Sequence, residues 1–273
     1  MHGLGNDFIL LDGIGKRLPQ LNRPKLAVSM CNRQTGVGAD GLILMIPSQM
    51  ADFRMRIFNS DGSEAEMCGN GFRCMIRCLH DRKFTLSKSI RVETIAGTII
   101  GQVIKSSKSQ FMVRVAMGSP EFDTRKIPVK TSKHELIQSK LKIGRKSIVV
   151  TVVSMGNPHV VLFVQDLDFD WKTLGAQIEV NPLFPQRTNV EFVHIINRGK
   201  IEVRSWERGA GATMASGTGA AAATAAGIKT GGLNDKVEVR FKLGSLMMEF
   251  DRKSGRIYKT GPAEYCFSGV YQY

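Results

Sequence analysis

The sequence predicts an α+β protein with many short strands and few helices. Strand-like segments dominate, and many of them alternate apolar and polar residues, as half-buried antiparallel strands do. Glycine, asparagine, aspartate or proline bounds each of them. The helical segments are too few to alternate with the strands, which argues against a βαβ architecture. The length of 273 residues fits one large domain or two domains of ordinary size.

The expected elements follow from this patterning. We expect helices over residues 24–32, from Gly69 through GFRCMIRCLH, and from Gly217 through GAAAATAAGIK. The third is rich in alanine, which predicts a close-packed central helix. A further short helix is expected in TSKHELIQSKLK, capped by Thr131 or Ser132. The expected strands are FILLDG, GLILMI, FRMRIF, SIRVETIAG, TIIGQVI, FMVRVAMG, SIVVTVVSMG, HVVLFV, NVEFVHII, IEVRSW, KVEVRF and LMMEF.

The charge balance allows a nucleic-acid-binding protein as one hypothesis, because 38 Lys and Arg face 24 Asp and Glu, for a net charge of +14. Much of the excess lies in the segment 125–146, where Glu135 is the one acidic residue. That segment has no aromatic residue for base stacking, so a solvated basic face is favoured over a nucleic-acid site. We therefore expect no nucleic-acid partner.

The cysteines and the N-terminal segment point to a reducing compartment. An odd number of cysteines, five, without tight spacing argues against a disulfide framework, and the gaps of Cys68, Cys74 and Cys78 do not fit a zinc site. Cys31, Cys74, Cys78 and Cys266 are expected to be core residues. No apolar run approaches the roughly 20 residues of a membrane span, and the first residues lack a signal peptide's basic region. We expect a cytoplasmic protein with no membrane contact.

Two later helices share a start motif. Cys68-Gly69-Asn70-Gly71 corresponds to Ser216-Gly217-Thr218-Gly219, and the two motifs lie 148 residues apart, about half the chain. This repeat predicts two similar halves, each presenting one helix N-terminus. Such an end offers unpaired N–H groups and a partial positive charge, so it can bind a carboxylate. The same field favours the thiolate of a cysteine in the first turn, and a nearby histidine or carboxylate can accept the thiol proton.

Polar residues among the strands predict a pocket for a zwitterionic amino acid. Four asparagines stand in or beside apolar strands, and Glu207 precedes Arg208. The arginine suits a carboxylate, while amide and backbone oxygens suit an ammonium group. The asparagines are Asn6, Asn59, Asn157 and Asn189.

These motifs together resemble the diaminopimelate epimerase family. The matching segments run in family order over essentially the whole chain, and the combination is far more specific than any one of them. They are HGLGNDF (2–8), TGVGADG (35–41), FNSDGSEAEMCGNGFRC (58–74), MGNPHVV (155–161), RTNVEFV (187–193), ERGAGATMASGTGAA (207–221) and GPA (261–263).

The resemblance implies a fold, a domain division and a mechanism. The fold is two pseudo-symmetric α+β domains, each an antiparallel sheet wrapped around a central helix, with the active site in the cleft between them. Their expected bounds are 1–114 plus 263–273 for the half with Cys68, and 115–262 for the half with Ser216. Without a cofactor or metal, one cysteine removes the α-proton of diaminopimelate and a second returns a proton. Cys68 matches the first cysteine.

The resemblance also assigns the other site residues. His159 and Glu207 match the groups that assist the two thiols. Backbone amides at Gly69, Asn70, Gly217 and Thr218 would bind the reacting carboxylate. The distal amino-acid end would be held by Asn59, Asn157, Asn189 and Arg208, and Asn6 matches a further pocket residue. Members of the family form lysine and peptidoglycan precursors and often dimerise, so a homodimer is expected.

Departures from the family pattern leave alternatives open. Ser216 stands at the second cysteine position, and an alcohol is a far weaker acid than a thiol, so epimerisation is expected to be impaired. Gly41 and Ala212 replace polar residues that many relatives carry. The serine is an introduced substitution, a natural slow variant, or the sign of a one-base reaction. The alternative function is therefore a racemase of another amino acid or a one-base lyase on the same fold.

Overall fold

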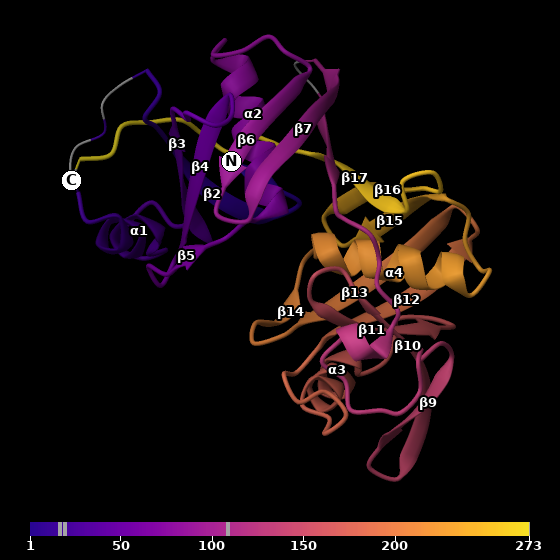
Figure 1. Ribbon diagram of the computed structural model, residues 1–273. Coiled ribbons are helices and arrows are strands. Elements are labelled where there is room, and N and C mark those ends of the chain that lie inside the picture. Colours follow the sequence, from indigo (N-terminus) through magenta and orange to yellow (C-terminus); the bar gives the residue numbers. More distant parts are fainter. Residues whose placement is uncertain (16–17, 19–20, 108–109, 273) are drawn as a thin grey trace. The chain divides into compact units, whose positions relative to one another are not determined.

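The computed structural model describes residues 1–15, 18, 21–107 and 110–272 and divides into two compact units (Figure 1). The first unit comprises Met1–Val115 and Thr260–Tyr273, and the second comprises Ala116–Lys259. Strand β17 (Arg256–Pro262) carries the chain from the second unit back into the first. Both units combine strands with few helices, which confirms the α+β class.

The first unit is a mixed sheet with a helix on each side. Strands β2 and β3 are parallel, β3 and β4 antiparallel, β4 and β6 parallel, and β6, β7 and β8 antiparallel. The elements are β1 (His2–Gly3), β2 (Asn6–Asp12), α1 (Arg23–Cys31), β3 (Gly41–Ile46), β4 (Phe53–Asn59), β5 (Glu64–Ala65), α2 (Gly69–Asp81), β6 (Ser89–Thr94), β7 (Gly97–Ser106) and β8 (Phe111–Ala116).

Helix α2 supplies the main core of this unit because its apolar side chains point at the sheet. Phe72, Met75 and Ile76 are fully buried and pack with Ile43 of β3 and Ile57 of β4. Burying such side chains contributes roughly 1.5–3 kcal/mol each. The packing fixes the start of α2, Gly69, at one end of the sheet. Helix α1 closes a second cluster over the other face.

The second unit wraps its sheet around α4. Strands β9 and β10 form a hairpin, β10 and β11 are antiparallel, β11 and β12 parallel, β12 and β13 antiparallel, β13 and β15 parallel, and β15 and β16 antiparallel. The elements are η1 (Thr124–Lys126), β9 (Ser139–Ile143), β10 (Lys146–Ser154), β11 (Pro158–Val164), α3 (Trp171–Glu179), β12 (Asn189–Asn197), β13 (Lys200–Glu207), β14 (Gly211–Thr213), α4 (Gly217–Lys229), β15 (Lys236–Phe241) and β16 (Gly244–Asp251).

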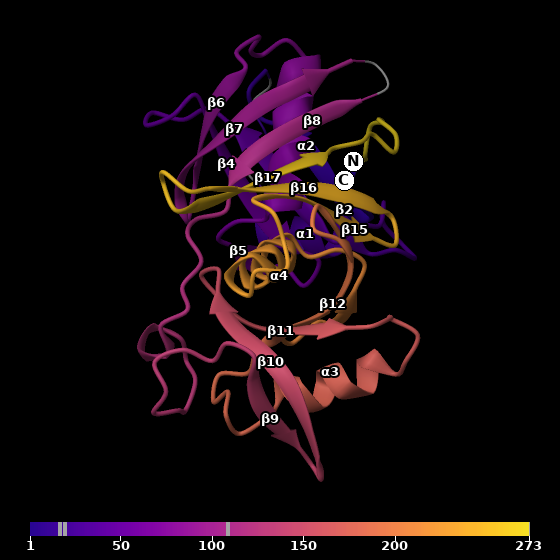
Figure 2. The same ribbon diagram turned by 90° about the vertical axis from the view of Figure 1, so that its right-hand side faces the viewer.

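Helix α4 is central, as its composition predicts. It contacts β10, β11, β12, β13, β15 and β16, and Figure 2 shows these strands around it. Its alanines from Ala220 to Ala223 are fully buried. A helix with small apolar side chains on every side can be enclosed by strands, because alanine lets the strands pack close to the helix backbone.

The structure corrects three expectations. The sheets are mixed, with two parallel pairs in each unit, and are not wholly antiparallel. The segment 131–142 forms no helix: Ser139–Ile143 is strand β9, because hairpin pairing with β10 buries Leu141 and outweighs the local helical signal. Cys266 is exposed and is not a core residue, because it follows β17 in a segment without regular structure.

The expectations for the other cysteines and for the basic segment are confirmed. Cys31, Cys74 and Cys78 are buried, and all five cysteines are free thiols. The basic side chains of the segment 125–146 are exposed, as a solvated face requires. Among the described residues, no helix combines the length and apolar character that a membrane crossing needs.

Candidate functional site

The first candidate group is Cys68 at the start of α2. Cys68 is the N-cap residue, with extended backbone angles (φ −136°, ψ 117°), and its side chain makes no capping hydrogen bond. The thiol is half-buried, and the helix N–H groups that follow it have no side-chain cap from residue 68. An uncapped N-terminal turn leaves backbone donors free for an anion and places a positive field beside the thiol.

The Cys68 thiol and two asparagine side chains form one hydrogen-bonded group. The Cys68 Sγ donates to Oδ1 of Asn6 at 3.7 Å, and the same oxygen accepts a bond from Nδ2 of Asn70 at 3.1 Å. Asn70 is the second residue of α2 and is buried, while Asn6 begins β2. Asn6, more than 60 positions away in the sequence, is therefore brought to Cys68 and Asn70 within one unit.

Arg73, which the sequence analysis missed, lies under the same helical turn. It is fully buried, donates from Nε to the carbonyl of Pro262 at 2.9 Å and from Nη1 to the carbonyl of Gly69 at 3.2 Å. Burial lowers its pKa, and the charges of thiolates at Cys74 and Cys68 act in the opposite direction. Arg73 therefore ties the first turn of α2 to the end of β17. In the sequence, the only sign of this role is that Arg73 lies on the side of the predicted helix that faces the core.

The second candidate group is Ser216 at the start of α4. Its backbone angles (φ −121°, ψ 124°) match those of Cys68, and α2 and α4 each have 13 residues. Unlike Cys68, Ser216 caps its own helix: its Oγ accepts from the Gly219 N–H at 3.1 Å. The hydroxyl donates to Oε2 of Glu207 at 3.3 Å. Ser216 and Glu207, both predicted from sequence, are thus brought together.

His159 lies in a buried pair with a residue that the sequence analysis missed. Its Nδ1 lies 2.9 Å from Oε1 of Glu191, and its Nε2 lies 2.9 Å from Oδ1 of Asn157. His159 and Glu191 are fully buried. Burial raises the pKa of the Glu191 carboxyl, against the opposing effect of the His159 ring. Both ring nitrogens of His159 therefore have a side-chain oxygen within hydrogen-bond distance, which fixes the position of the ring.

Asn189 ties the first residue of β11 to the end of β13. Its Nδ2 donates to the carbonyl of Pro158 at 2.8 Å, and its Oδ1 accepts from the backbone N–H of Arg208 at 2.9 Å. The Arg208 side chain is exposed, with Nη1 donating to the Gln186 carbonyl at 3.1 Å. The arginine therefore has further N–H donors for a carboxylate.

Asn59 is the last residue of β4 in the first unit. Its hydrogen bonds join it to the turn after β4 and not to Cys68. Its Nδ2 donates to Oγ of Ser63 at 2.9 Å, across a turn closed by Gly62. The residue is exposed, so its amide oxygen is open to a ligand.

Lys259 is a further buried residue that the sequence analysis missed. A Cβ atom added to Gly217, the first residue of α4, would lie only 2.4 Å from the Lys259 Nζ. The ammonium group is therefore against the N-terminal turn of that helix, and the lysine is buried. A side chain at position 217 would have to displace it, so glycine fits both the ligand approach and the lysine. Thr218 follows Gly217 and is half-buried.

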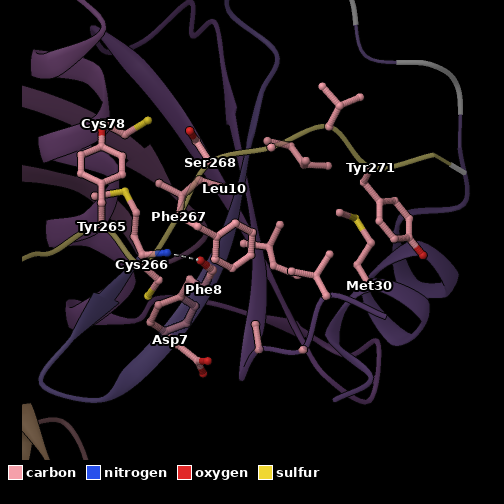
Figure 3. Close-up of a pocket in the computed structure, with 18 of the residues that line it drawn as sticks. Asp7, Phe8, Leu10, Met30, Cys78, Tyr265, Cys266, Phe267, Ser268 and Tyr271 are labelled. Atoms are coloured by element: carbon pink, nitrogen blue, oxygen red, sulfur yellow. Dashed lines mark hydrogen bonds between the residues drawn. The ribbon is translucent and has the colours of Figure 1, made fainter. Parts of the chain in front are cut away.

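A cavity of about 210 Å³ lies elsewhere, in the first unit. It is lined by β2 and by the C-terminal segment from Tyr265 to Tyr271, which crosses over β2 in Figure 3. None of the sequence-predicted site residues lines it. We place one candidate group at the N-terminus of α2 and the other at the N-terminus of α4, because Cys68 and Ser216 lie there. Among the described residues, no group of histidine, cysteine, aspartate and glutamate has the arrangement of a metal site.

Known proteins resemble this chain over its full length. The family model described as diaminopimelate epimerase matches residues 1–122 and 151–266. The diaminopimelate epimerase of Pelotomaculum thermopropionicum is 48% identical over 273 residues, covering 100% of this chain and 97% of that protein. The diaminopimelate epimerase of Methanococcus maripaludis is 42% identical over 270 residues, covering 98% of this chain and 97% of that protein.

Solved structures share the fold at low identity. A phenazine biosynthesis protein of the PhzF family from Bacillus anthracis has a TM-score of 0.67 at 19% identity, covering 97% of this chain and 93% of that one. A probable proline racemase from Agrobacterium radiobacter has a TM-score of 0.67 at 16% identity, covering 99% and 91%. These likenesses show the two-domain pseudo-symmetric fold. Because the family model matches most of the chain and these relatives are 42–48% identical over 98–100% of it, the chain belongs to the diaminopimelate epimerase family.

Proposed function

We propose that this protein converts LL-diaminopimelate to meso-diaminopimelate by cofactor-independent proton transfer, in the synthesis of lysine and peptidoglycan precursors. The observation that carries the proposal is the pair of matched helix starts, α2 after Cys68 and α4 after Ser216, in a chain of this family. We also propose that residues 1–114 plus 263–273 and residues 115–262 are the two epimerase halves.

The reaction needs a base, an acid and a site for the carbanion. The Cys68 thiolate takes the α-proton and becomes a thiol, and the electron pair of the C–H bond passes into the carboxylate-stabilised carbanion. The backbone N–H groups at Gly69, Asn70, Gly217 and Thr218 stabilise this charge, since preorganised dipoles act before any rearrangement. The buried Lys259 Nζ lies beside the same turn of α4.

Ser216 supplies the second proton and limits the rate. Its hydroxyl gives a proton to the carbanion and recovers one from water, while the Cys68 thiol releases the proton it took to water, so the proton count closes. Forming an alkoxide is costly, because a hydroxyl gives up its proton far less readily than a thiol. The Glu207 carboxylate accepts a hydrogen bond from Ser216 and orients the hydroxyl, but leaves the serine neutral at rest. Epimerisation is expected to be slowed most in the direction in which Ser216 has to act as the base and remove the α-proton.

The polar residues outside the reacting pair set the substrate. We propose that Asn59, Asn157, Asn189 and Arg208 bind the distal amino-acid end, that Asn6 is a further pocket residue, and that His159 and Glu207 assist the two proton-transferring groups. The exposed Arg208 guanidinium and the open Asn59 amide offer groups of the two kinds that a distal carboxylate and ammonium need.

Isotope exchange tests the proposal. The protein is incubated with LL- or meso-diaminopimelate in D₂O, and α-deuterium and configuration are followed by mass spectrometry and chiral chromatography. We expect deuterium at the α-carbon, with slow inversion and unequal rates from the two substrates. Exchange without any inversion would instead indicate a one-base enzyme. Exchange with another amino acid and none with diaminopimelate would overturn the substrate.

The partners and the compartment follow from the same proposal. We propose a cytoplasmic enzyme that binds neither nucleic acid nor membranes and that forms a homodimer. Exposed Ile95, Ile100 and Ile104, on and just before β7, support self-association, because exposed apolar patches mark interfaces. Light scattering after gel filtration should give about twice the chain mass of 30.1 kDa. A mass of one chain would contradict the dimer.

A further inference from the structure

A hydrogen-bonded chain leads from the surface to the Cys68 thiol. Arg33 donates from Nη2 to Oδ1 of Asp40 at 2.8 Å, and Asp40 accepts at Oδ2 from Nδ2 of Asn6 at 2.7 Å. Oδ1 of Asn6 then accepts from the Cys68 thiol at 3.7 Å. Every member lies in the first unit. The candidate cysteine is thus three hydrogen bonds from an exposed guanidinium.

The donor and acceptor groups fix the direction of each hydrogen bond in this series. A carboxylate only accepts hydrogen bonds, so Asp40 must face the NH₂ side of the Asn6 amide. The carbonyl side of that amide is then left for Cys68. Nδ2 of Asn70 donates to the same oxygen at 3.1 Å, which agrees with this orientation. Without Asp40, either side of the Asn6 amide could face the thiol.

Asp40 is itself held in place from two sides. Its Oδ2 accepts from the backbone N–H of Asp7 at 3.1 Å, next to the bond from Asn6. Arg33 bridges Asp40 to the Asp7 carboxylate, with distances of 2.8 Å and 2.7 Å from Nη2. Charge-assisted bonds of this kind restrain geometry more strongly than neutral ones. The loop after α1 and the start of β2 therefore hold the carboxylate at a fixed position.

We propose that Asp40 is a positioning residue, which turns the Asn6 amide so that its carbonyl oxygen faces Cys68. A carbonyl oxygen holds the proton on the sulfur, whereas an N–H group in its place would stabilise the thiolate. Asp40 thereby governs where the proton of Cys68 rests without touching the sulfur. The catalytic meaning of this role rests on the proposed function, but the amide orientation and the thiol reactivity do not.

Alkylation of Cys68 tests the proposal without any substrate. Iodoacetamide reacts with thiolates, and peptide mass spectrometry reports each cysteine separately. In Asp40→Ala, Cys68 should be alkylated about fivefold faster at pH 7, the effect of one hydrogen bond. The exposed Cys266 is an internal reference, and its rate should not change. The buried Cys31, Cys74 and Cys78 should stay unmodified, which verifies folding.

A conservative variant separates positioning from charge. Asp40→Asn removes the negative charge but keeps a carbonyl oxygen that can accept from Asn6, so Cys68 should react at the parent rate. Equal acceleration in Asp40→Ala and Asp40→Asn would show a charge effect and overturn the proposal. No acceleration in Asp40→Ala would overturn it as well.

A double-mutant cycle gives a second test. Because Asp40 acts through Asn6, adding Asp40→Ala to Asn6→Ala should leave the alkylation rate of Cys68 as it is in Asn6→Ala alone. A persistent effect of Asp40→Ala in that background would contradict the proposed role. Failure of the epimerase assay would leave both alkylation results unaffected, so the two proposals fail separately.

Discussion

The Ser216 hydroxyl lies between its own helix and the Glu207 carboxylate. It accepts from the Gly219 N–H at 3.1 Å and donates to Oε2 of Glu207 at 3.3 Å. Serine is among the best N-cap residues, and Cys68 at the equivalent place makes no capping bond. At position 216, serine therefore favours helix stability, whereas cysteine would favour proton transfer.

Ser216→Cys should gain activity and lose stability. A thiol forms a thiolate far more readily than a hydroxyl forms an alkoxide, so we expect kcat for epimerisation to rise by about 10²–10⁴, the usual range for a general acid or base. The lost cap should lower the free energy of unfolding by about 0.5–2 kcal/mol. Chiral chromatography and urea unfolding measure the two effects.

Ser216→Ala is the matched control for that substitution. It loses the cap without supplying a thiol, so it should be destabilised like Ser216→Cys and show no gain in kcat. Unchanged activity in Ser216→Cys would mean that the serine is not the only defect, and that the reaction differs from two-base epimerisation.

Glu207 should matter much more beside a thiol than beside a hydroxyl. In the parent chain the serine rests neutral, so Glu207→Gln, which keeps an acceptor oxygen, should change kcat by less than about threefold. In Ser216→Cys the carboxylate can take the thiol proton, so adding Glu207→Gln should remove about 10- to 100-fold of the regained rate. Equal effects in both backgrounds would contradict the assignment of Glu207 to position 216.

The parts of the fold that the sequence predicted are those with strong local signals. The starts of α2 and α4 follow from Gly-x-Gly motifs, and their N-cap residues carry similar backbone angles in the structure. Helix α3 was missed although Asp170 caps it and Trp171, Leu174 and Ile178 are spaced for one face. The opposite error at 139–143 arose because cross-strand pairing with β10 is not visible in a local window.

The candidate site was predictable where the chemistry sits on a motif, and not where it depends on tertiary contacts. Cys68, Ser216 and Glu207 stand in recognisable segments. Arg73, Glu191 and Lys259 gain their importance from burial, and burial of a charged residue has no signature in a single sequence. The link from Asp40 to Asn6 likewise joins residues 34 positions apart.

Asp7 should make stability depend on acidity. Burial by itself raises the pKa of Asp7, but hydrogen bonds from Arg33 and Asp40 and the charge of Arg33 outweigh it, so the pKa is lowered. A carboxyl with a lowered pKa stabilises the fold above its unfolded pKa, and this contribution is lost as the pH falls through the folded value. Asp7→Asn should therefore lower Tm at pH 7, and this effect should shrink as the pH falls below the unfolded pKa of about 3.9. The exposed Asp168→Asn is the control, and a cost for Asp7→Asn that does not change with pH would contradict the ion pair.

Glu191 should be among the most sensitive positions of the second unit. It pairs with His159 at 2.9 Å where both side chains are fully buried, and its Oε2 is buried without a hydrogen-bond partner among the described residues. Removing one member of a buried ion pair leaves the other charge uncompensated, at a cost of about 3–5 kcal/mol. Glu191→Ala should show that loss in urea unfolding. Glu202→Ala, which breaks a half-buried pair with Arg204 that water still reaches, should cost less than about 1 kcal/mol. A loss for Glu191→Ala no larger than that for Glu202→Ala would contradict the importance of the buried pair.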